Sequence, residues 1–196
     1  YGMATSDLSE IAKASISDQV NIIVETGGCK KWQNSIVSNS VNEIYQVKSG
    51  GLKQLEKNFG KDSMTDPDNL TSFIKYCNKN FPADRNFLIM WDHGGGSISG
   101  FGYDEKQSGN DTMNLSEISS ALKKANCKFD CIGFDACLMA TLETAIVCSD
   151  YADYLIASEE SEPGTGWYYT SWVNALSNNT SIPTVELSKV IIDDYV

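Results

Sequence analysis

The chain has 196 residues, of which 41% are hydrophobic and 21% charged, the balance of an ordinary folded domain rather than a disordered one. Its 15 Lys and Arg against 26 Asp and Glu give a net charge of −11, which disfavours binding to nucleic acid and to anionic membrane surfaces. No stretch approaches the roughly 18 apolar residues of a membrane span, and the first residues lack signal-peptide character. We therefore expect one domain over residues 1–196, with no nucleic-acid partner and no membrane span.

Four short apolar runs, each ended by glycine or by polar residues, predict β-strands at 20–26, 86–92, 129–135 and 154–158. Helical spacing of apolar residues, with polar capping residues near the starts, predicts helices at 6–14, 68–79, 115–125, 138–148 and 185–195. Residues 29–51 predict a hairpin or insertion with a short strand at 44–47. Residues 94–109 are rich in glycine and serine and predict an exposed loop.

The alternation of strands and helices predicts the α/β class, with a mostly parallel central sheet between two helical layers, an α/β/α sandwich. Most of the unusual polar residues follow the consecutive strands: His93, then Cys137, then Glu159 and Glu160. Ligands of open parallel sheets bind beyond the carboxyl ends of the strands. We therefore expect these side chains to meet in one crevice.

His93 is the only histidine of the chain, and it lies in the motif WDHGGG at a strand end. A lone histidine is often only a structural residue. Three glycines directly after it indicate a place where the backbone approaches another group closely, and this favours a functional role.

Cys137 lies between a predicted strand and a predicted helix, in the motif GFDACLMA. At a helix N-terminus the free N–H groups and the helix dipole lower a thiol pKa and activate the thiolate. Cys131 and Cys148 lie inside apolar segments and are expected to be core residues. The six cysteines are not spaced like a disulfide framework, and Cys127 with Cys131 lacks the four ligands of a zinc site, so we expect no metal.

A cysteine nucleophile with a histidine elsewhere in the chain is the pattern of a thiol hydrolase. His93 comes first here and Cys137 second. The backbone N–H groups of Gly94 and Cys137 are then candidates for an oxyanion hole.

WDHGGG and GFDACLMA together resemble the clostripain family of cysteine peptidases, relatives of the caspases, and VNIIVETGG and ASEESEPGTGWYY extend the resemblance over most of the chain. The resemblance implies a caspase-like fold, Cys137 as nucleophile, His93 acting on the leaving group, and cleavage of proteins or peptides after Arg or Lys. It also implies a secreted or cell-surface bacterial protein and a monomer. No cofactor is required, although some members depend on calcium.

The resemblance assigns further residues. Asp135, two positions before the nucleophile, corresponds to the acid of the S1 pocket, with Glu159 and Glu160 as candidates for its rim. The bond between Lys106 and Gln107 is the candidate for self-processing. The sequence leaves a simpler interpretation open for each of them. Asp135 would then be a helix cap, Glu159 and Glu160 part of an exposed acidic loop, and Lys106 an ordinary surface lysine.

Family members begin with a strand before the first helix and continue beyond a helix such as the one predicted at 185–195, and the chain has neither part. Two other functions stay open from the sequence. One is a non-catalytic caspase-like binding or scaffold module, and the other is a thiol hydrolase of small amides or esters.

Overall fold

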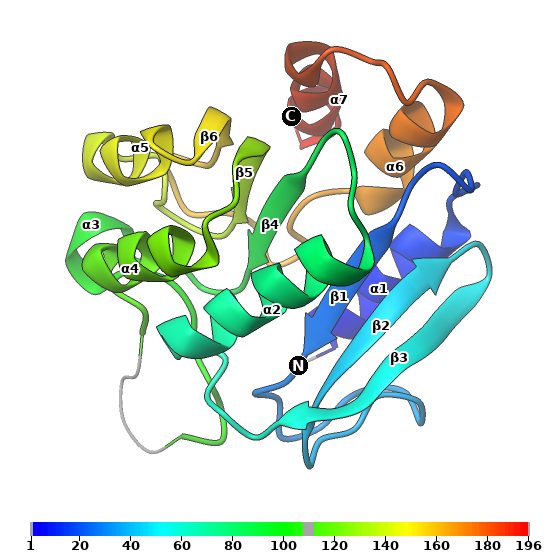
Figure 1. Ribbon diagram of the computed structural model, residues 1–196, viewed down its shortest axis with the longest axis horizontal. Helices are drawn as coiled ribbons and strands as arrows, with labels where there is room; N and C mark the ends of the chain where they lie inside the picture. Colours follow the sequence, from blue (N-terminus) through cyan, green and yellow to red (C-terminus); the bar gives the residue numbers. More distant parts are fainter. Residues whose placement is uncertain (1, 108–111, 196) are drawn as a thin grey trace. The chain divides into compact units, whose positions relative to one another are not determined.

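A computed structural model describes residues 2–107 and 112–195 of the chain (Figure 1). The chain divides into two compact units, which we call the first and the second unit. The first consists of Tyr1–Lys61 with Gly164–Val196, and the second of Asp62–Pro163. Every site residue that the sequence predicts lies in the second unit. In the described ranges, no helix combines the length and the apolar character needed to cross a membrane.

The second unit is built on a three-stranded parallel sheet. Its strands are β4 (Phe87–Trp91), β5 (Phe129–Asp135) and β6 (Ala152–Ile156), in that order across the sheet. The strands predicted at 86–92 and 129–135 are confirmed, and the one predicted at 154–158 is present but lies two residues earlier, at 152–156. Short apolar runs bounded by polar residues are typical of buried parallel strands. The pairing of β4 with β5 ends at Trp91 opposite Asp135.

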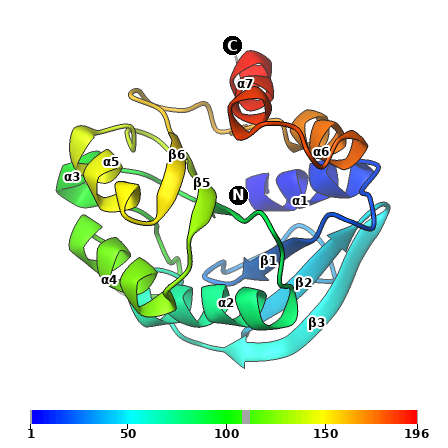
Figure 2. The ribbon, with the colours of Figure 1, turned by 45° about the horizontal axis from the view of Figure 1, so that its top comes forward.

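The helices of the second unit begin at the capping residues that the sequence offers. Helix α2 (Pro67–Asn80) begins after Asp66, whose side chain accepts a hydrogen bond from the Asp68 N–H. Helix α4 (Leu115–Ala125) matches its predicted range and begins with a capping box between Asn114 and Glu117. Helices α3 (Gly96–Ser99) and α5 (Leu142–Ser149) complete the unit, and α2 lies beside α4 in both Figure 1 and Figure 2.

The core of the second unit lies between the sheet and these helices. Leu88 and Met90 alternate along β4 with less buried residues, and they pack with Phe134 of β5 and with Ile118 and Leu122 of α4. Burying each such side chain contributes about 1.5–3 kcal/mol. This packing fixes β4 and β5 against each other, and with them the residues that follow the two strands.

The first unit holds a separate antiparallel sheet of β1 (Ile22–Thr26), β2 (Asn42–Lys48) and β3 (Gly51–Gly60). The sequence interpretation of β1 as a parallel strand is wrong, because β1 pairs antiparallel with β2. An apolar run indicates burial but carries no signal of strand direction. Helices α1 (Met3–Lys13), α6 (Tyr169–Asn178) and α7 (Thr184–Tyr195) belong to the same unit (Figure 2); α7 agrees with its predicted range, whereas α6 was not predicted.

The predicted hairpin of residues 29–51 is longer than expected. Its arms are β2 and β3, joined by a two-residue connection in which Gly50 has a φ of +88°, a conformation that favours glycine. The second arm escaped prediction because half of its residues are polar and all of them are at least partly exposed to solvent.

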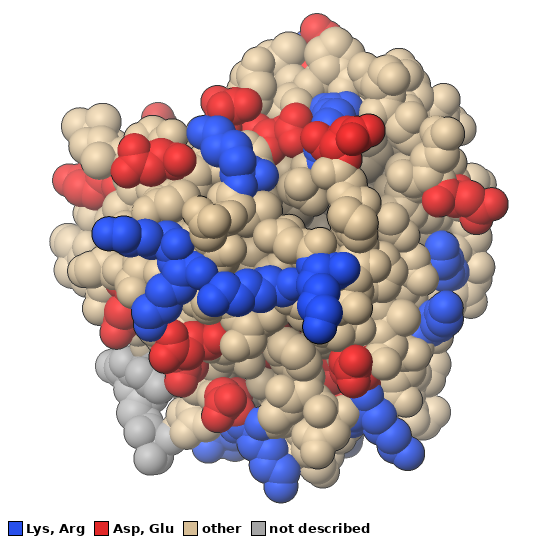
Figure 3. Space-filling view, viewed as in Figure 1, with Lys and Arg blue, Asp and Glu red and all other residues tan. Residues whose placement is uncertain are grey.

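Charge is unevenly distributed over the surface despite the net value of −11. Figure 3 shows Lys and Arg side chains gathered over α2 and α4, which carry Lys75 and Lys79, and Lys123 and Lys124, respectively. Lys124 pairs with Asp68 at 2.6 Å, but both side chains are exposed, so the pair contributes little to stability.

Candidate active site

His93 and Cys137 occupy equivalent positions beyond two neighbouring parallel strands. Trp91 and Asp135 are paired at the ends of β4 and β5, and each of the two candidate residues comes two positions later. The N–H of Asp92 donates to the Asp135 carbonyl at 3.3 Å, which continues the pairing one residue further. The register of the sheet therefore delivers histidine and cysteine to the same edge, as predicted from the sequence.

Gly94 brings the histidine segment into contact with the cysteine segment. A Cβ atom on Gly94 would overlap the Cys137 carbonyl oxygen and would lie 2.9 Å from Cγ of Met139. Gly94 also forms an antiparallel β-bridge with Phe101. Two hydrogen bonds of 2.8 Å flank this bridge: the Gly102 N–H donates to the His93 carbonyl, and the Gly95 N–H donates to the Gly100 carbonyl. No backbone carbonyl of the described residues accepts from the N–H of Gly94 or Cys137.

The turn after β5 differs from the sequence prediction. Helix α5 begins at Leu142, after the capping residue Thr141, and not at 138. Cys137 therefore lies in a turn several residues before the helix, and activation by a helix N-terminus does not apply. Leu138 has a φ of +62°, a left-handed conformation that costs a non-glycine residue on the order of 1–2 kcal/mol. Backbone strain thus lies directly after the candidate nucleophile.

The segment after β6 contacts the sulfur of Cys137. The Glu162 N–H donates to Cys137 Sγ at 3.2 Å, and the thiol lies 3.8 Å from the Glu162 carbonyl oxygen. The N–H of Leu138 donates to the Glu160 carbonyl at 3.0 Å, and that of Ala140 donates to the Ser158 carbonyl at 2.9 Å. The backbone of the segment after β6 therefore fixes the position of the Cys137 sulfur.

The other cysteines are separated from Cys137 by their surroundings. All six are free thiols, and Cys137 is half-buried. Cys131 and Cys148 lie in the core, as predicted, and burial raises the pKa of these thiols to about 12 and about 11. Because the thiolate is the nucleophile, these two buried sulfurs are unsuited to attack.

His93 is exposed, and its backbone is fixed by the side chain that precedes it. Asp92 Oδ1 accepts from the His93 N–H at 2.6 Å, and Asp92 Oδ2 accepts from the Tyr103 N–H at 3.1 Å. Burial raises the pKa of the Asp92 carboxyl, while these two N–H groups and the charge of His93 lower it in part and the charge of Asp104 raises it. The rings of His93 and Tyr103 meet edge to face, with centroids 6.3 Å apart.

The remaining predicted residues fall into two places. Asp135 is buried, with 4% of its surface exposed, and Glu159 and Glu160 are exposed on the segment after β6. Lys106 and Gln107 lie on an exposed turn, where the Lys106 N–H donates to Asp104 Oδ1 at 2.8 Å and the Gln107 N–H donates to the Asp104 carbonyl at 3.3 Å. The structure thus brings Gly94, Cys137 and the residues after β6 together. The bond between Lys106 and Gln107 lies on a separate turn.

The prediction that residues 94–109 form one exposed loop is wrong in its first half. Residues 96–99 form helix α3, and Phe101 is buried against Phe134, with ring centroids 5.7 Å apart. Phe101 also bridges Met113, which is 1% exposed. An apolar residue between glycines was the available signal for this packing. Residues 108 and 109 lie outside the described ranges.

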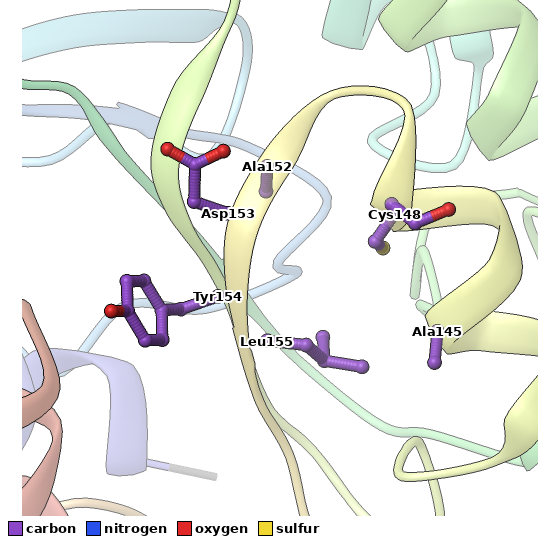
Figure 4. Close-up of a pocket in the computed structure, with 7 residues that line it drawn as sticks. Ala145, Cys148, Ala152, Asp153, Tyr154 and Leu155 are labelled. Carbon is purple, nitrogen blue, oxygen red and sulfur yellow. The ribbon is translucent and has the colours of Figure 1, made fainter.

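One pocket of about 120 Å³ lies between α5 and β6 in the second unit. Figure 4 shows Leu155 and Cys148 on the helix side of β6, and Tyr154 on the opposite side of the strand. None of its lining residues is a predicted site residue. Among the described residues, no three His, Cys, Asp or Glu side chains are grouped to hold a metal ion.

Three functional candidates were missed in the sequence. Asp92 had a usable signal, because it is an acidic residue between an apolar strand and the glycine motif. Leu138 and Glu162 had none: a left-handed conformation at leucine is not visible in a sequence, and Glu162 contacts Cys137 through its backbone.

Comparison with solved structures defines the fold. A secreted C11 cysteine protease from Bacteroides thetaiotaomicron, solved with an irreversible peptide inhibitor, superposes with a TM-score of 0.78 at 24% identity, over 98% of this chain and 53% of that one. An inactive zymogen C11 protease from Parabacteroides distasonis gives 0.73 at 22% identity, over 98% and 54%. The predicted caspase-like α/β fold, which these proteases share, is confirmed.

The sequence profile of the clostripain family matches residues 1–196, and the chain therefore belongs to the clostripain family. Clostripain of Hathewaya histolytica is 35% identical over 124 residues, which cover 55% of this chain and 23% of that protein. The chain thus spans about half the length of the structural relatives and about a quarter of clostripain.

Proposed function

We propose that the protein is a cysteine endopeptidase in which Cys137 attacks a peptide carbonyl after Arg or Lys and His93 transfers the protons. The observation that carries this proposal is the matched position of the two residues beyond β4 and β5, with Gly94 packed on the Cys137 carbonyl. The C11 relative crystallised with a peptide inhibitor supports peptides as the substrate class.

The proposed reaction needs no cofactor. His93 takes the thiol proton, and the Cys137 thiolate forms a bond to the carbonyl carbon while the carbonyl oxygen gains negative charge. The N–H groups of Gly94 and Cys137 bind that oxygen, since no backbone carbonyl of the described residues occupies them. His93 then protonates the departing amine, and it later takes a proton from the water that hydrolyses the thioester.

Asp135 is the proposed determinant of basic specificity. A carboxylate that is 4% exposed is a poor partner for water but a strong one for a guanidinium or ammonium group entering beside the nucleophile. Glu159 and Glu160 are exposed, so their charges are screened by water and act only on the approach of the substrate.

The test compares peptides that differ only in Arg, Lys or Ala at the cleaved position. We expect Arg and Lys peptides to be cleaved and the Ala peptide to be spared. Asp135→Asn should lower kcat/KM for the basic peptides about 100-fold or more, because a buried charge pair loses 2–5 kcal/mol when one partner is removed. Glu160→Gln is the matched control and should change kcat/KM for the basic peptides only a few-fold.

The assay uses the longest form of the protein that its gene encodes, because the chain spans about half of its structural relatives. Equal cleavage of the Ala peptide would contradict the basic specificity. Peptide binding without cleavage would favour a binding module, and hydrolysis of small amides alone would favour the non-peptidase alternative.

Self-processing at the bond between Lys106 and Gln107 is a second part of the proposal. Both residues are exposed, and the bond follows a basic residue, which is the specificity proposed for the enzyme. Lys106→Ala should leave one band on a denaturing gel where the unchanged protein gives two. Lys123→Ala, an exposed lysine within α4, is the control and should be cleaved normally. Two fragments from Lys106→Ala would contradict the assignment.

We also propose that the protein is secreted by a bacterium and acts as a monomer. The C11 relative from Bacteroides thetaiotaomicron is described as secreted, which supports the first part. Recovery of the protein from culture medium and its mass in solution test the two statements.

A further inference from the structure

The segment that carries His93 leaves the sheet after β4 and folds back on itself at Gly102 and Tyr103. Between His93 and Gly102 lie the glycine motif and α3, and the two arms are joined by the bond from the Gly102 N–H to the His93 carbonyl. The Asp92 carboxylate lies at the base of this loop. One of its oxygens accepts from the N–H of His93 and the other accepts from the N–H of Tyr103.

This arrangement determines where the imidazole is held. The His93 side chain is exposed to solvent. Its neighbour is the Tyr103 ring, which meets it at an interplanar angle of 71°. Both rings therefore depend on backbone that Asp92 binds, one on each arm of the loop.

The surroundings of Asp92 disfavour its ionised form. Burial disfavours the ionised carboxyl, and the N–H groups of His93 and Tyr103 offset this only in part, so the pKa of Asp92 is raised. The titratable groups that face it are His93, whose charge favours the carboxylate, and Asp104, whose charge opposes it.

We propose that Asp92 is a positioning residue that holds the His93 imidazole in its reactive orientation by binding the backbone at both ends of the loop. The inference rests on the proposed role of His93. Asparagine at this position keeps one acceptor oxygen but presents an NH₂ group to the second backbone N–H, so one arm is released. The substrate site itself is unchanged.

The activity test measures kcat and KM for Asp92→Asn with the Arg peptide. We expect kcat to fall about 10- to 100-fold with KM changed less than threefold, because a misplaced acid–base group slows the chemistry without weakening binding. A rise in KM at constant kcat would overturn the proposal.

The orientation test uses the fact that His93 is the only histidine. In protein labelled with ¹⁵N-histidine and carrying Cys137→Ala to prevent cleavage, we expect one sharp set of imidazole signals. Asp92→Asn should broaden this set or split it into several. The imidazole signals do not depend on turnover, so they test the inference separately from the proposed function. Activity retained in His93→Ala would instead contradict the proposed function.

Asp104 supplies the matched control. It is a buried carboxylate near the end of the same segment, and it accepts backbone N–H groups from Met64 at 3.0 Å and Lys106 at 2.8 Å. Asp104→Asn removes a charge that acts on Asp92, but the bonds that it weakens involve neither the His93 N–H nor the Tyr103 N–H, so the imidazole signals should stay unchanged. Equal disturbance by both variants, or none by a folded Asp92→Asn, would overturn the proposal.

Stability measurements accompany both tests. Since the folded state raises the pKa of Asp92, the folded protein binds the proton more tightly than the unfolded chain, and stability falls as pH rises through that range. The stability of the unchanged protein relative to Asp92→Asn should therefore fall from acid to neutral pH. If Asp92→Asn does not fold, Asp92→Ser, whose hydroxyl accepts from one arm only, takes its place in the kinetic and spectroscopic tests.

Discussion

Replacing Cys137 with alanine should lower peptide cleavage by about 10⁶-fold while leaving the thermal unfolding curve nearly unchanged. The thiol forms the covalent bond in the proposed mechanism, and the two core cysteines, Cys131 and Cys148, cannot replace it because both are buried with raised pKa values. His93→Ala should be about as damaging. The measurement is single-turnover hydrolysis of an Arg peptide by each variant.

The double variant Cys137→Ala with His93→Ala sharpens this test. Residues that act as one unit lose their whole effect when either is removed, so the double variant should be no slower than the single ones. Additive losses would mean that the two residues act independently, and the dyad would be wrong. Cys29→Ala, a half-buried free thiol in the first unit, is the control and should keep full activity.

Gly94→Ala should lower kcat about 100-fold or more and the free energy of unfolding by about 1–3 kcal/mol. The added methyl group would overlap the Cys137 carbonyl oxygen, which is backbone and cannot rotate away. The segments that carry His93 and Cys137 must then separate. Steady-state kinetics and chemical unfolding measure the two effects.

Gly51→Ala is the control for that substitution. A Cβ at Gly51 meets nothing within 4 Å, so this variant should be as stable as the unchanged protein or slightly more stable. Full activity in Gly94→Ala would contradict the close contact and, with it, the proposed place of the Gly94 N–H in the oxyanion hole.

The sequence predicted the parts of the fold that depend on local pattern. The strands ending near Trp91 and Asp135 are bounded by clear apolar runs, and α4 begins where Asn114 and Glu117 form a capping box. The order of these elements was enough to place histidine and cysteine at one sheet edge. The family resemblance then agreed with the profile match over the whole chain.

The errors concern features that depend on partners distant in the sequence. β1 has the composition of a parallel strand, but its direction is set by β2. Residues 138–148 have helical periodicity throughout, yet bonds from Leu138 and Ala140 to the segment after β6 hold the first residues in a turn. The role of Asp92 depends on the backbone of Tyr103, which a sequence pattern does not locate.

The pairing of Trp91 with Asp135 has a consequence for how such a site can diversify. A slip of one residue between β4 and β5 would move His93 by about 3.3 Å and turn its side chain to the other face of the sheet. Insertions in the exposed turn around Lys106 would leave that alignment intact. New substrates are therefore accessible to this scaffold through changes in its loops, whereas the spacing from strand end to reactive residue cannot vary.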